Sequence, residues 1–193
     1  MSGLFNSCQN LYEINVENFI TDNVVDMPNL FKFIKKFKYS KFNTSKIKNM
    51  CSMFKGCSNL ESLDDSNFGT SKIEDMFNLF LNLTYVTSLE VSNFNTKNIK
   101  DMSLMFGGCG KLQNLNVSNF NAKNVEFFSS MFENCFELKE IDVSKFDTNN
   151  AREIEGSFHN CYEIKKFDLS KFSTKKIKKL TFLFNSCSSL ASY

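Results

Sequence analysis

The chain repeats itself every 26 residues, and this period constrains its fold more than any other feature. A Phe marks each unit, and successive marks are 26 residues apart, except for the shorter step from Phe31 to Phe54. The marks are Phe5, Phe31, Phe54, Phe80, Phe106, Phe132, Phe158 and Phe184. A fixed period of this length is typical of repeat architectures, in which each unit buries its apolar face against its neighbours. We therefore expect a single domain over residues 1–193.

Each unit contains two apolar spacings. Leu115 and Val117, and their equivalents in other units, are two residues apart, which is the period of a β-strand. The second half of the unit is different, since Ile99, Met102 and Met105 are three residues apart, close to the spacing of one helical face. These two spacings predict a short strand followed by a helix in every unit.

The ends of the expected helices also have matching residues. A Thr precedes the helical half in almost every unit, as at Thr96, with Ala122 as the exception, and Thr is a favourable helix N-cap. A Gly or Asn such as Gly108 follows about eleven residues later, where a left-handed residue would end the helix. The sequence thus predicts an α/β repeat, a leucine-rich-repeat-like solenoid with a parallel strand face, a helical face and about seven turns. An all-helical repeat is the alternative.

Six of the seven cysteines share one position of the repeat. They are Cys8, Cys57, Cys109, Cys135, Cys161 and Cys187, and Cys51 lies outside this column. Because Ile34 and Leu83 occupy the same position in two units, we expect the column to be buried and to pack as free thiols. Disulfide bonds between neighbouring members are the alternative.

The chain offers few residues for catalysis, so we expect no enzymatic activity. His159 is the single His and occupies a position that other units fill with Asn, Lys, Gly or Glu, which indicates a turn at the surface. Gly107, Gly108 and Gly110 fit the end of a helix better than a phosphate-binding loop. We expect no cofactor and no metal site. A net charge of +2 argues against nucleic-acid binding, and no apolar run is long enough to predict a membrane span.

Two outward-facing columns beside the expected strands are acidic or rich in hydroxyl groups, and they form our candidate binding face. The first contains Asp64, Glu90, Asn116, Asp142 and Asp168, and the second contains Ser66, Ser92, Ser118, Ser144 and Ser170. Lysines gather instead on the other side of each unit. The faces of extended repeat proteins often bind partners, so we expect a basic or polar protein partner here. A solvated surface without a partner is the alternative.

The segment from Met105 to Met131 carries a nearly complete copy of the pattern Met-Phe-x-x-Cys-x-x-Leu-x-x-Leu-x-Val-Ser-x-Phe, followed by x-Thr-x-x-Ile-x-x-Met. This pattern resembles the repeat of BspA-like leucine-rich-repeat proteins, in the variant found in mycoplasma-type lipoproteins. The resemblance implies a cell-surface or secreted protein with an adhesive or protein-binding role toward a host or matrix protein, although the chain shows no targeting signal. A structural protein that self-associates end to end, or an intracellular scaffold, is the alternative.

Overall fold

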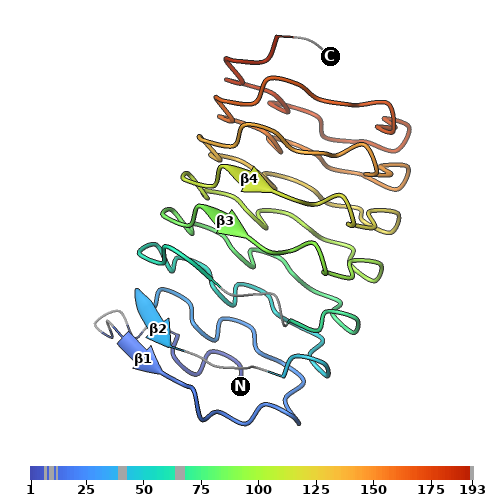
Figure 1. Cartoon of the computed structure of the whole chain (residues 1–193). Helices are drawn as coiled ribbons and strands as arrows, with labels where there is room; N and C mark the ends of the chain where they lie inside the picture. The colour runs from blue at the N-terminus through green and yellow to red at the C-terminus, as the bar shows by residue number, and fades with distance from the viewer. Residues whose placement is uncertain (7, 9–10, 12, 39–42, 64–67, 192–193) are drawn as a thin grey trace.

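The computed structural model describes residues 1–6, 8, 11, 13–38, 43–63 and 68–191. The chain winds into a stack of similar turns, with its two termini at opposite ends of the stack (Figure 1). One repeat unit makes one turn, because amide groups donate to carbonyls one unit further along. The amide of Phe80 donates to Met105 at 3.0 Å, and the amide of Phe106 donates to Met131 at 2.9 Å. Equivalent positions in successive units therefore lie above one another in columns.

The strands are short, and all of them pair in parallel with the next turn. β1 (Glu13–Asn15) pairs with β2 (Lys36–Lys38), and β3 (Ser88–Leu89) pairs with β4 (Asn114–Leu115). Isolated parallel bridges join Asp26 to Asn49, Asn49 to Asp75, Asp101 to Phe127, Asn114 to Glu140, Phe127 to Glu153, and Glu153 to Lys179. We call the surface around β3, β4 and the residues in register with them the strand face. It contains much less regular strand than the repeat pattern predicts.

The predicted α/β repeat with a helical face is wrong, because none of the described residues lies in a helix. In an α-helix every amide donates to the carbonyl four residues earlier. In the segment predicted to be helical, the backbone amides donate in turn to a carbonyl three residues earlier and to a carbonyl in the next turn. Lys55 donates three residues back to Ser52 at 3.2 Å, whereas Phe54 donates to Leu79 in the next turn at 3.1 Å. The predicted leucine-rich-repeat-like solenoid is therefore not the architecture observed. No described segment is a helix long and apolar enough to cross a membrane.

Left-handed residues at two positions of each unit interrupt any run of helical dihedral angles. One column contains Asn29, Ser52, Asn78, Leu104, Ser130, Gly156 and Phe182, and the other contains Phe33, Gly56, Asn82, Gly108, Asn134, Asn160 and Ser186. The Gly and Asn residues expected to end helices do adopt the left-handed conformation, but no helix precedes them. At Gly108, with a φ of 71°, an added Cβ would lie 2.1 Å from the side-chain oxygen of Asn82.

The repeating Phe residues form a continuous column through the core. Phe80, Phe106 and Phe132 are buried, and their ring centroids are 5.7 Å and 5.5 Å apart in successive pairs. Phe120 belongs to a second Phe column and lies 6.4 Å from both Phe106 and Phe146. Because each ring contacts the turns above and below it, burial of the core depends on the stacking of neighbouring units.

The recurring Thr of the repeat has a structural role different from the predicted helix cap. Thr96 is buried, and its hydroxyl donates to the carbonyl of Asn121 in the next turn at 3.2 Å. The same hydroxyl accepts a hydrogen bond from the amide of Asn121 at 2.7 Å. The Thr column therefore joins adjacent turns and satisfies backbone groups that would otherwise be buried without partners.

The Cys column is buried in the middle of the stack, and its members are free thiols, as predicted. Cys109 and Cys135 are fully buried, whereas Cys8 and Cys187 near the two ends are half-buried. Each bonded thiol donates to a Phe carbonyl in the preceding turn, as Cys135 does to Phe106 at 3.2 Å. Burial raises the pKa of Cys109 to about 12, so this thiol stays neutral at physiological pH. A neutral, hydrogen-bonded thiol suits packing rather than nucleophilic chemistry.

Candidate functional site

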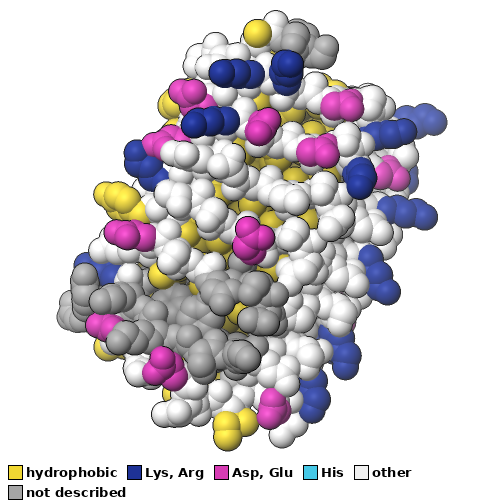
Figure 2. Space-filling model, in the orientation of Figure 1, with side chains coloured by type: hydrophobic (Ala, Val, Ile, Leu, Met, Phe, Trp, Pro, Cys, Tyr) yellow, Lys and Arg dark blue, Asp and Glu magenta, His cyan; other side chains and the backbone are white. Residues whose placement is uncertain are grey.

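A shallow depression on the strand face contains four residues of the predicted binding face. They are Asn116, Ser118, Asp142 and Asp168, and the other residues that line it are Asn114, Leu115, Glu140, Ile141 and Lys166. The depression therefore extends over three successive turns of the stack. Figure 2 shows this side of the molecule, where acidic side chains stand out from a band of apolar surface.

Alternation along the short strands places these side chains at the surface. Leu115 and Val117 are buried, while Asn114 and Asn116 between and beside them are exposed. Ile141 is buried one turn further on. The apolar residues thus fix the backbone to the core, and the polar side chains in between project outward from it.

Hydrogen bonds to nearby Ser residues hold the two Asp side chains in place. The amide of Ser144 donates to the carboxylate of Asp142 at 3.0 Å, and the amide of Ser170 donates to Asp168 at 2.8 Å. Asn116 makes the equivalent contact with the amide of Ser118 at 3.1 Å. This column of Asn and Asp therefore has a structural role, since its side chains close turns that follow the strands.

The same hydrogen bonds affect protonation of the two carboxylates. The side-chain and backbone groups of Ser144 lower the pKa of Asp142, and the backbone amide and hydroxyl of Ser170 lower the pKa of Asp168. Both groups are therefore anionic at neutral pH. With Glu140 also present and Lys166 as the single cation among the lining residues, the depression has an excess of negative charge.

The structure does not bring all the predicted residues together. Ser144 and Ser170 are hydrogen-bond donors beside the depression rather than lining residues. Glu90 is exposed and Ser92 is half-buried in the preceding turn, outside the lining. The remaining two predicted residues, Asp64 and Ser66, lie outside the described residues.

Sequence reasoning missed three charged or polar residues of the lining, Asn114, Glu140 and Lys166. All three share one column, two residues before the predicted column of Asn and Asp. Strand alternation makes both columns face outward, so the spacing of two residues was the signal that could have identified them.

The chemistry of the depression suits binding through charge and hydrogen bonds. Its carboxylate and amide oxygens and the Ser118 hydroxyl can accept hydrogen bonds from ammonium, guanidinium and amide groups. Among the described residues no three His, Cys, Asp or Glu side chains form a cluster able to hold a metal ion. His159 is half-buried and lies away from the depression, with its ring 6.3 Å from that of Phe182.

Comparison with known proteins gives a family and nothing more specific. No curated protein and no solved structure matches the chain. The model of a family described as "Mycoplasma protein of unknown function, DUF285" matches it twice, over residues 1–88 and residues 78–193. These two matches together span the whole sequence, and the chain therefore belongs to the DUF285 family of Mycoplasma proteins of unknown function.

Proposed function

We propose that the chain is a non-catalytic protein-interaction module of a cell-surface protein, and that the depression on the strand face binds a basic segment of a protein partner. The observation that carries this proposal is the position of Asp142 and Asp168 on adjacent turns, both anionic and both fixed by hydrogen bonds. Because these carboxylates are already ordered, their side chains would lose little conformational entropy when a partner binds. The resemblance of the repeat to BspA-like surface proteins supports a location at the cell surface and an adhesive role.

The partner that best suits this surface is an extended peptide with Lys or Arg side chains. The two Asp residues occupy one column, so their carboxylates are separated by about one turn spacing, on the order of 5 Å. Leu115 and Ile141 form the apolar part of the lining beneath them. A basic side chain could contact carboxylates with its charged group while its aliphatic stem lies on this apolar surface.

Charge removal without loss of the turns tests the proposal. Asp142→Asn and Asp168→Asn together remove two charges but keep an acceptor oxygen, as Asn116 does naturally in the same column. We expect the double variant to bind a fluorescent lysine-rich peptide about three- to thirtyfold more weakly than the wild type, from two exposed ionic contacts. Binding would be measured by fluorescence anisotropy, with a glutamate-rich peptide as the negative probe.

The matched control removes two charges elsewhere, at Glu74 and Glu163, which are exposed and outside the depression. Glu74→Gln with Glu163→Gln should leave the affinity for the lysine-rich peptide nearly unchanged. Equal losses in the two double variants would show that only net charge matters. Such a result, or equal binding of the two peptides by the wild type, would contradict a specific site on the strand face.

A further inference from the structure

A second charged surface lies along the edge of the stack, in the loops that follow the Thr column. We call it the lysine row, and it consists of Lys46, Lys72, Lys97, Lys123, Lys175 and Lys176. All six side chains are exposed. Figure 2 shows lysines following one another along the right-hand edge, where loops of successive turns lie in Figure 1.

The two columns that form the row contain no acidic residue from residue 45 onward. Their other members are Ser45, Ser71, Asn98, Asn124, Asn149 and Asn150. The hydrogen bonds of the row are to amides, as from the ammonium of Lys46 to Asn23 at 3.0 Å and from that of Lys176 to Asn150 at 2.7 Å. The positive charges of the row are therefore not neutralised within its own columns.

The neighbouring column, only two residues further along each unit, has a different arrangement of charge. There cations and anions alternate from turn to turn, as Lys48, Glu74, Lys100, Glu126 and Arg152. Lys48 pairs with Glu74 at 3.4 Å, and Arg152 pairs with Glu126 at 3.0 Å. Glu74 and Glu126, which follow Lys72 and Lys123 closely in sequence, thus already have cationic partners of their own.

Side-chain amides fix the loops of the row relative to one another. The amide nitrogen of Asn124 donates to the carbonyl of Lys97 at 2.8 Å, and that of Asn150 donates to the carbonyl of Lys123 at 2.9 Å. Each bond joins one loop to the loop of the preceding turn. The backbone that carries the lysines is therefore held in line along the stack.

The lysines of the row are arranged in a line, which suits a linear ligand. Successive turns are separated by about one strand spacing, so the six loops from residue 46 to residue 176 extend over about 24 Å. At one end the row enters a hollow lined by Arg152, Lys175, Lys176, Ile177 and Lys178. The density of positive charge is therefore highest at this end, where one terminus of an anionic chain would be held most firmly.

We propose that the lysine row binds a linear acidic polysaccharide that lies along the stack axis. A narrow line of ammonium groups matches a single chain with regularly spaced anionic groups. The row contains no aromatic side chain on which nucleobases would stack. It also lacks the apolar side chains by which a protein surface inserts into a bilayer. This inference concerns a different surface from the depression and does not depend on the peptide-binding proposal.

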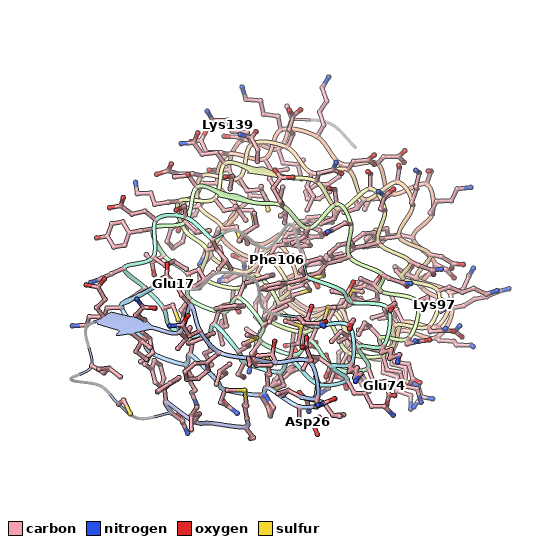
Figure 3. The ribbon with its side chains drawn as sticks, turned by 60° about the horizontal axis from the view of Figure 1, so that its bottom comes forward. Glu17, Asp26, Glu74, Lys97, Phe106 and Lys139 are labelled. Carbon is pink, nitrogen blue, oxygen red and sulfur yellow. The ribbon has the colours of Figure 1, made fainter. Side chains whose placement is uncertain are left out.

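Charge reversal in adjacent turns tests the inference, with sulfated heparin oligosaccharides as the probe. Lys97→Glu with Lys123→Glu should weaken binding by roughly tenfold or more, because two contacts become repulsive. The matched control is Lys139→Glu with Lys165→Glu, which reverses two exposed lysines of adjacent turns in another column. Figure 3 places Lys97 and Lys139 on different sides of the molecule, with Lys97 pointing outward from the stack.

Calorimetric titration of both double variants and the wild type would give the affinities. We expect binding by the wild type and the control, a fall in affinity with added salt, and weaker binding of oligosaccharides shorter than the row. Equal losses in both variants, or no loss in either, would overturn the inference. Tighter binding of single-stranded oligonucleotides or of anionic phospholipid vesicles would overturn the choice of a polysaccharide. Unchanged binding of the lysine-rich peptide by the Lys97/Lys123 variant would separate this site from the strand face.

Discussion

Ala122 interrupts the column of buried Thr residues, and replacing it with Thr should stabilise the protein. One turn earlier, the Thr96 hydroxyl donates to the carbonyl of Asn121 at 3.2 Å and accepts from the amide of Asn121 at 2.7 Å. Asp147 occupies the position equivalent to Asn121 in the turn above Ala122. Since Ala has no hydroxyl, neither of these two bonds can form there.

The size of the effect follows from the two missing bonds and the space at this position. A buried hydrogen bond contributes a net 0.5–1.5 kcal/mol or so, which gives about 1–3 kcal/mol for two. Ala122 is only 1% exposed, so the added atoms must displace neighbours, at a cost that offsets part of this gain. One turn further on, Thr148 fits the same environment and bonds to the carbonyl and amide of Ser173 at 3.2 Å and 2.7 Å. We therefore expect Ala122→Thr to raise the free energy of unfolding by about 1 kcal/mol.

Urea denaturation followed by circular dichroism would measure this difference. The matched control is Ala122→Val, which adds nearly the same shape as Thr but no hydroxyl. If the hydrogen bonds are responsible, the Thr variant should be the more stable of the two by about 1–2 kcal/mol. Equal stability of the Thr and Val variants would refute the assignment of the Thr column as a hydrogen-bonded connection between turns.

Three other predictions concern the core and the turns. Phe120→Ala should lower the free energy of unfolding by about 3–5 kcal/mol in urea denaturation, and a loss below about 1 kcal/mol would mean that the ring is not buried. Gly108→Ala should cost about 1–2 kcal/mol in the same assay because of its left-handed φ, and an unchanged midpoint would contradict that conformation. Burial raises the pKa of Cys57 and of Cys109 to about 12 each, whereas the pKa of an exposed thiol is about 8.5. The two buried neutral thiols therefore contribute their full stabilisation of the folded state below about pH 8.5, and this contribution decreases as the pH rises toward 12. Urea midpoints should therefore fall at alkaline pH, and Cys109→Ala should make that fall shallower.

The repeat predicted which residues are buried far better than it predicted the backbone. Columns of Phe, Cys and aliphatic residues depend only on which positions recur, and these columns do form the core. The apolar spacing of three residues favoured a helix. Turns closed by backbone hydrogen bonds between residues three apart also place every third side chain on one side of the chain. Gly and Asn at left-handed positions suggested helix ends, but the same residues also close turns that follow no helix. Leu104, with a φ of 58°, gave no such signal, because Leu rarely adopts the left-handed conformation.

The candidate site was predictable in part. The column of Asn and Asp was visible in the sequence because its members alternate with buried residues such as Leu115 and Val117. The role of Asp142 in closing a turn with Ser144 was not, since that bond depends on local backbone geometry. Strand alternation also turns the column of Glu140 outward, but the charge of Glu140 does not indicate which turns combine into a depression.

Both proposed binding surfaces depend on the folding of the repeat into stacked, hydrogen-bonded turns, with no helix among the described residues. Far-ultraviolet circular dichroism of the folded protein tests it most directly. We expect a spectrum without the double minimum of an α-helix, and loss of this spectrum in one cooperative step on unfolding. A strong helical spectrum, with the content expected for one helix in every unit, would contradict the claim and would restore the fold that the apolar spacing predicts.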